Sequence, residues 1–120
     1  MHANTNIIFG TAQLIKGYGL NHSNISKYEL EKIFETLKTH NCNHIDTALN
    51  YSGVLKKIGK FNLSKFKIIN KFPKIKSRTE KDMKNEMEIF FDFSFKNLNI
   101  NQIDTILLHD IEDIKNNDRI

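Results

Sequence analysis

Four polar residues of this chain could together carry acid–base chemistry: Asp46, Tyr51, Lys71 and His109. A phenol is a weak acid at neutral pH, and a neighbouring ammonium stabilises its anion and so eases loss of the proton. A carboxylate can fix that ammonium, and an imidazole can orient a carbonyl oxygen by hydrogen bonding. Such a set could deliver a proton to oxygen as hydride arrives at carbon, and the hydride would need a reduced nicotinamide or similar cofactor.

Each of these residues, taken alone, also has an ordinary structural explanation. Asp46 could cap the following turn, and Tyr51 could be a half-buried aromatic residue. Lys71 could be solvated, and His109 could hydrogen-bond a loop carbonyl. The catalytic interpretation therefore depends on a fold that brings the four side chains together.

Short β-rich segments alternate with longer helical segments along the chain. Strands are expected over residues 6–11, 43–47, 66–71 and 103–109. Helices are expected from a Ser26–Glu29 capping box to a stop at Asn41, over Val54–Ile58 with an end at Gly59, and from Ser77 or Thr79 to Leu98. This alternation predicts an α/β fold with parallel strands and right-handed crossovers. The C-terminal ends of parallel strands share one rim, where we expect the four polar residues to converge.

Other clusters of polar or apolar residues have structural interpretations. The third helix carries an apolar stripe that is expected to be packing surface, made of Met83, Met87, Phe90, Phe91, Ser94 and Leu98. Asp110, Glu112 and Asp113 are expected to be surface charges or charges at the start of a helix. The segment His40–His44 alternates His, Cys and His, but zinc needs three or four tetrahedral ligands and no second cluster accompanies it, so no metal site is expected.

Composition favours one globular domain. The chain has 120 residues, of which 39% are hydrophobic, and no apolar run approaches the ~18 residues of a membrane span. No secretory signal is visible, and the single Cys42 fits a reducing cytoplasm. The net charge is +4, from 16 Lys and 2 Arg against 14 acidic residues. Arginine is the residue that suits recognition of phosphates and bases, so its scarcity makes a nucleic-acid partner the weakest alternative. The basic run over residues 65–78 is interpreted as solvated strand flanks.

Several segments resemble one enzyme family, the aldo-keto reductases. His44–Tyr51 resembles the Asp-Thr-Ala-x-x-Tyr motif of that family, and Gly10–Gln13, with Tyr18, Gly19 and Asn21, is similar to the first strand and loop of one of its branches. Ile69–Phe72 is similar to the family's Thr-Lys segment, and Leu107–His109 to its Leu-Leu-His segment. Gly59 matches the glycine that closes the short helix. The order and approximate spacing of these segments agree across most of the chain.

This resemblance implies a (β/α)8 TIM barrel that reduces a small-molecule aldehyde or ketone to an alcohol with NADPH. It makes Tyr51 the proton donor and Lys71 the partner that makes the phenol more acidic. Asp46 is then the carboxylate paired with Lys71, and His109 orients the carbonyl. For the cofactor site, it places Gly10, Thr11, Ala12 and Asp46 beside the nicotinamide ribose. The substrate itself and the choice of NADP over NAD are not specified by these motifs.

The chain departs from the family pattern in sequence and in length. Ser52 stands where a glycine is usual, Val54 and Leu55 occupy the Ser-Glu positions, and Ile15 replaces a common glycine. The short helix is therefore expected to be capped differently. A complete barrel needs about 250 residues, so residues 1–120 are expected to form only the first four β/α units, as a truncated domain that can be inactive alone. The alternative is a non-catalytic half-barrel that acts by assembly with a partner, for example as a homo-oligomer, since its outer strands would expose unpaired edges.

Overall fold

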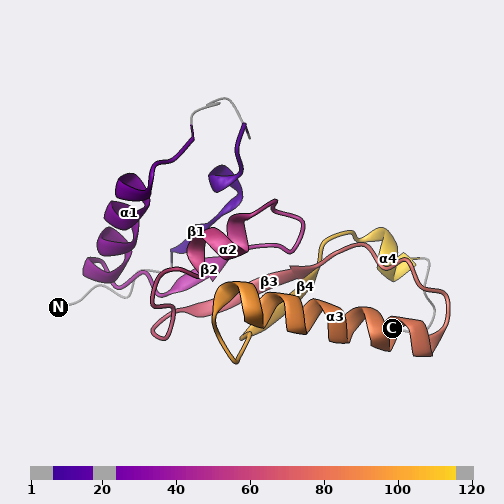
Figure 1. Ribbon diagram of the computed structural model, residues 1–120. Coiled ribbons are helices and arrows are strands. Elements are labelled where there is room, and N and C mark those ends of the chain that lie inside the picture. The colour runs from indigo at the N-terminus through magenta and orange to yellow at the C-terminus, as the bar shows by residue number, and fades with distance from the viewer. Residues whose placement is uncertain (1–6, 18–23, 116–120) are drawn as a thin grey trace.

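The computed structural model describes residues 7–17 and 24–115. Its elements, in order, are β1 (Ile8–Gly10), a 3-10 turn η1 (Ala12–Leu14), α1 (Lys27–Thr39), β2 (His44–Asp46), α2 (Val54–Ile58), β3 (Lys67–Phe72), α3 (Glu80–Leu98), β4 (Thr105–Leu108) and α4 (Glu112–Lys115) (Figure 1). The family-like residues Tyr18, Gly19 and Asn21 lie outside the described residues. None of the helices in the described ranges is long and apolar enough to cross a membrane.

The four strands form one parallel sheet in the order β1-β2-β3-β4. This arrangement confirms the predicted α/β class with parallel strands. Within the described residues, β1, β2 and β4 are shorter than expected, and β3 is shifted by one residue to Lys67–Phe72. Some residues just beyond the strand ends still make single backbone bonds to the neighbouring strand. At the end of β1, for example, Thr11 N donates to Asp46 O at 2.9 Å.

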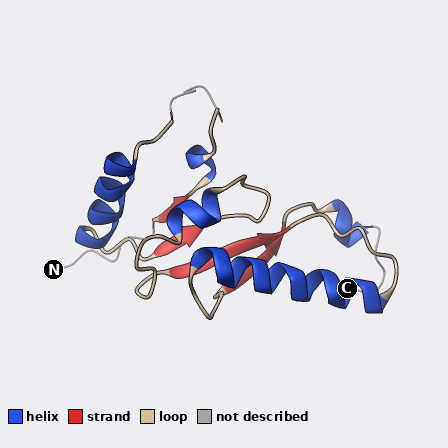
Figure 2. Ribbon diagram, viewed as in Figure 1, coloured by secondary structure: helices blue, strands red, loops and turns tan. Residues whose placement is uncertain are grey.

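The helices cover one face of this sheet (Figure 2). Ile45 of β2 and Ile68 of β3 are register partners, so their side chains point to the same face. They share a buried core with residues of α1, α2 and α3: Leu30, Phe34, Val54, Leu55, Ile58 and Leu98. The opposite face is open, and Ile8 and Leu107 on it are 52% and 44% exposed.

The helix ends follow the local signals in the sequence. Ser26 and Glu29 form the predicted capping box, with Ser26 N donating to Glu29 Oε2 at 2.7 Å. This backbone bond lowers the pKa of the Glu29 carboxyl. Of the two predicted starts for α3, Thr79 is correct: its hydroxyl accepts from Asp82 N, while the Ser77 hydroxyl bonds the Glu86 carboxylate.

The short helix α2 begins and ends at glycines. Gly53 precedes it with φ of 70° and no side-chain cap, which confirms that this helix is capped without the family's usual hydroxyl. Gly59 ends it against the last turn of α3. A Cβ at Gly59 would overlap the Asn97 carbonyl oxygen and lie 2.8 Å from Leu98 Cα. Only glycine therefore allows α2 and α3 to pack this closely.

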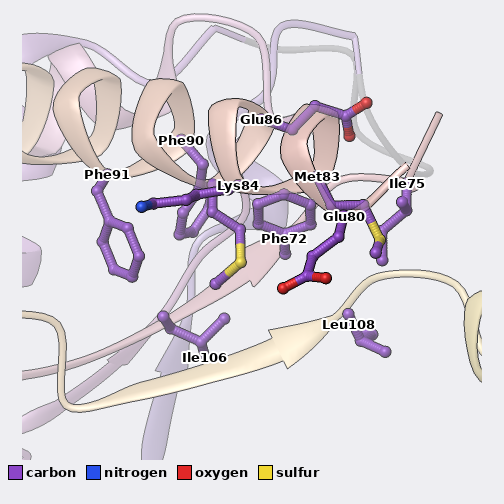
Figure 3. A pocket seen from close by; sticks show the side chains of 11 residues that line it. Phe72, Ile75, Glu80, Met83, Lys84, Glu86, Phe90, Phe91, Ile106 and Leu108 are labelled. Carbon is purple, nitrogen blue, oxygen red and sulfur yellow. The ribbon is translucent and has the colours of Figure 1, made fainter. Parts of the chain in front are cut away.

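The apolar stripe of α3 packs on the sheet along only part of its length. Phe90, Ser94 and Leu98 are buried as predicted, whereas Met87 is 48% exposed. A groove of about 440 Å³ remains between the first half of α3 and the ends of β3 and β4. Figure 3 shows Met83, Phe90 and Phe91 reaching from the helix toward Ile106 and Leu108 of β4 across this groove. The groove lies on the helix-covered side of the sheet.

Replacing Gly59 by alanine is expected to destabilise the chain by at least about 2 kcal/mol, because backbone atoms of α3 would have to move. Chemical denaturation with a constant m-value would measure the loss. The matched control is Gly10→Ala, where a Cβ meets no heavy atom within 4 Å. Equal stability of the two variants would contradict the close-packing explanation.

Candidate active site

The parallel register brings the four predicted catalytic residues to one rim of the sheet. Asp46 ends β2, Lys71 is the penultimate residue of β3, and His109 directly follows β4. Tyr51 lies in the turn between β2 and α2, where its N–H donates to Ala48 O at 3.1 Å. The convergence expected from the topology is therefore present in the structure.

An ion pair joins the ends of β2 and β3. Lys71 Nζ donates to Asp46 Oδ1 and, at 3.4 Å, to Thr47 O. The side chains of Lys71 and Asp46 are 19% and 31% exposed, so this pair is only partly shielded from water. Its attraction lies between that of a surface pair and that of a pair in a dry interior.

The two aromatic candidates lie next to this ion pair. Lys71 Nζ lies over the Tyr51 ring, 5.8 Å from its centroid, within the usual range of a cation–π contact. The His109 ring meets the Tyr51 ring edge-on, with centroids 6.2 Å apart and an interplanar angle of 88°. All four side chains thus form one contiguous cluster in which a cation and a carboxylate sit beside a phenol and an imidazole.

A buried polar pair behind the cluster supports Lys71. Asn70 Nδ2 donates to Ser94 Oγ of α3 at 3.0 Å, and both residues are fully buried. The same amide accepts the Lys71 N–H through Oδ1 at 2.9 Å. Asn70 therefore ties the backbone of the lysine to the helix layer. We did not assign this role from the sequence, although a polar Ser94 inside an otherwise apolar stripe was a usable signal.

The residues expected to bind cofactor differ in what they offer. Gly10 is the register partner of Asp46, and the space where its side chain would be is empty. Thr11 is fully buried, and its hydroxyl bonds Thr47 Oγ1 at 2.9 Å and Asp46 O at 3.1 Å. Ala12 opens the 3-10 turn that follows β1. Gly10 and Asp46 thus present open surface, while the Thr11 side chain holds the ends of β1 and β2 together.

The other candidate clusters have structural partners. Cys42 is buried, and its thiol donates to Ile7 O at 3.2 Å. Across the described ranges, no three His, Cys, Asp or Glu side chains are grouped so that they could hold a metal ion. Of the two expectations for Asp113, the position at the start of a helix is correct, since it lies in the first turn of α4. It is not a surface charge: it is only 3% exposed, and its carboxylate accepts the Ile75 N–H at 3.1 Å.

Comparisons with known proteins extend this picture. The family model "Aldo/keto reductase family" matches residues 6–117. Two solved structures share the fold, both of proposed aldo-keto reductases from Pseudomonas aeruginosa. The first, PA4992, has a TM-score of 0.72 and 17% identity, and the match covers 91% of this chain and 46% of that one. The second has a TM-score of 0.70 and 16% identity over 91% of this chain and 44% of that one.

The chain thus spans a little under half the length of these structural relatives. The search of curated proteins finds no match. The parallel sheet with alternating helices and the partial coverage of the structural relatives agree with part of a (β/α)8 barrel. Because the family model spans nearly all of its residues, the chain belongs to the aldo/keto reductase family.

Proposed function

We propose that this chain supplies the catalytic residues for NADPH-dependent reduction of an aldehyde or ketone to an alcohol. Membership of the aldo/keto reductase family points to an oxidoreductase-type function. The observation that supports the finer proposal is the single cluster formed by the Asp46–Lys71 ion pair with the rings of Tyr51 and His109. A carbonyl reduction needs a proton donor next to a positive charge, and this cluster provides one.

Each residue of the cluster then has one role. The Tyr51 hydroxyl gives its proton to the carbonyl oxygen, and the Lys71 ammonium stabilises the phenolate left behind. Asp46 holds that ammonium in place, and His109 orients the carbonyl oxygen by hydrogen bonding. When bound, NADPH supplies the hydride to the carbonyl carbon.

The end of β1 fits the proposed cofactor position. No heavy atom lies within 4 Å of the Cβ position of Gly10, beside the Asp46 carboxylate on the open face of the sheet. Gly10 and Asp46 would contact the nicotinamide ribose with Ala12 nearby, while the buried Thr11 positions this edge. A cytoplasmic location belongs to the same proposal, supported by the single buried thiol of Cys42.

A second candidate function is assembly without catalysis. Within the described sheet, β1 and β4 each pair on one side only. Leu107 of β4 and Ile8 of β1 expose apolar side chains on the open face. Unpaired strand edges of this kind are templates for association. A second copy of the chain could pair with these strand edges, and the assembly would then have a structural rather than a catalytic role.

The thermal unfolding midpoint of the chain is expected to rise saturably with NADPH, because a ligand of the folded state stabilises it by linkage, by about 2.7 kcal/mol at a hundred times Kd. Gly10→Val should remove this rise, since its side chain fills the space beside Asp46. Ile8→Val, on the same strand, is the matched control and should keep it. A chain that unfolds cooperatively with no NADPH response would count against catalysis by this chain and favour the assembly candidate.

Tyr51→Phe is expected to lower NADPH-dependent turnover of carbonyl compounds by at least about a hundredfold, since loss of general acid catalysis typically costs that much. The NADPH-induced shift in the unfolding midpoint should persist, because the hydroxyl is not proposed to bind the cofactor. Tyr28→Phe, at a 67% exposed position on α1, is the matched control and should turn over normally. Undiminished turnover in Tyr51→Phe would defeat the proton-donor assignment.

Under the assembly candidate, sedimentation velocity should show a discrete oligomer. Leu107→Lys places a charge on the open face at the β4 edge and should shift the chain to monomer. Ile89→Lys, at a 67% exposed position on α3, is the control and should leave the oligomer intact. A monomer at every concentration tested, or equal dissociation in both variants, would exclude pairing through this edge.

A further inference from the structure

A buried carboxylate connects the two loops that leave the catalytic rim. Asp113 of α4 accepts the N–H of Ile75 through Oδ2 at 3.1 Å, across 38 residues of sequence. Ile75 lies in the loop that follows β3 and Lys71, and Asp113 lies just past β4 and His109. In Figure 1, α4 sits beside this loop at the C-terminal end of β3 and β4. The bond therefore joins the segments that carry two of the four candidate residues.

The Asp113 bond is better shielded from water than the ion pair that also joins these loops. Lys74 Nζ and Asp110 Oδ2 form an ion pair at 3.3 Å, but their side chains are 64% and 35% exposed. An exposed pair of this kind contributes little to stability. Asp113 is only 3% exposed, so the bond that its side-chain oxygen accepts from a backbone N–H is screened from water.

The same turn fixes the backbone on both sides of His109. On one side, His109 N donates to Phe72 O at 3.0 Å. On the other, Asp113 N donates to Asp110 O at 3.2 Å, and Glu112 N donates to Asp110 Oδ1 at 3.0 Å. The bond from Glu112 N, with Lys74 next in importance, lowers the pKa of the Asp110 carboxyl and so keeps this acceptor charged. Asp113 adds the bond from Ile75 N, which anchors the turn after β4 to the loop after β3.

We propose that Asp113 is a positioning residue: by tying the loop after β3 to the turn after β4, it holds the His109 ring at the edge of Tyr51. The meaning of this role rests on the proposed function, in which His109 orients the carbonyl. The contact itself exists without substrate, with ring centroids 6.2 Å apart. It can therefore be tested on the chain alone.

The test is NMR spectroscopy of the 120-residue chain and its variants, without NADPH. In Asp113→Ala, amide exchange at Ile75 should be about tenfold faster, as expected when a buried hydrogen bond is lost. The His109 ring-proton shifts, which the edge-on Tyr51 ring perturbs, should move toward those of a free histidine. Asp113→Asn keeps an oxygen acceptor of the same shape and should retain both signals.

Asp104 provides the matched control at the opposite end of the sheet. Its Oδ2 accepts the N–H of Ile68 in β3 at 2.8 Å, so here too a carboxylate binds a backbone amide. Asp104→Ala should speed exchange at Ile68 and leave the His109 shifts unchanged. If Asp113→Ala does not fold, Ile75→Pro removes the same bond from the donor side and should give the same His109 response.

Three results would overturn the proposal. Unchanged His109 shifts in a folded Asp113→Ala or Ile75→Pro chain would show that the ring is held by other contacts. Equal shifts in Asp104→Ala would show a general loosening rather than positioning. Changes in Ile75 exchange and in the His109 shifts that are as large in Asp113→Asn as in Asp113→Ala would show that the oxygen acceptor is not what matters. None of these readouts depends on cofactor binding or turnover, so failure of the proposed function would be seen separately.

Discussion

Parallel pairing is the constraint on which the candidate site depends. Each helix returns the chain to the same end of the sheet, so every strand finishes at one rim. Gly10, Asp46 and Ile69 are aligned by the register, and this alignment carries Lys71 to the side of the Asp46 carboxylate. The fully buried hydroxyls of Thr11 and Thr47 then lock the ends of β1 and β2. A slip of one residue in β2 or β3 would turn Asp46 or Lys71 to the other face and break the ion pair.

The two faces of the sheet separate the apolar core from the proposed catalytic cluster. The helix-covered face holds the apolar core, including Ile45 and Ile68, and the buried Asn70–Ser94 pair. The open face holds the Asp46–Lys71 pair in partial contact with water. Charges act more strongly where water is excluded. For the proposed carbonyl reduction, the ion pair would therefore stabilise developing charge more strongly in a closed barrel than in this partly exposed sheet.

Sequence reasoning succeeded where a signal was local or followed from topology. The capping box at Ser26 and the closing Gly59 are local patterns, and the convergence of polar residues follows from β/α alternation. It placed Asp113 at the surface or at the start of a helix, and did not predict that this residue of the first turn of α4 would be buried. A buried carboxylate needs hydrogen-bond partners. One partner of Asp113 is the Ile75 amide, which lies 38 residues away in the sequence and cannot be predicted from the residues near Asp113. The Asn70–Ser94 bond was missed for the same reason, since its partners come from different elements.

The four candidate residues are not held with equal firmness. Asp46 and Lys71 belong to strands, and the sheet itself fixes their backbones. Tyr51 and His109 lie in turns, where single bonds such as His109 N to Phe72 O replace a full ladder. Catalytic geometry is sensitive to displacements of about 1 Å. The precision with which Tyr51 and His109 are placed therefore depends on how firmly the turns hold them. Substitutions that loosen a turn should therefore disturb the Tyr51–His109 contact before they unfold the chain. Substitutions in the apolar core should unfold the chain before they affect this contact selectively.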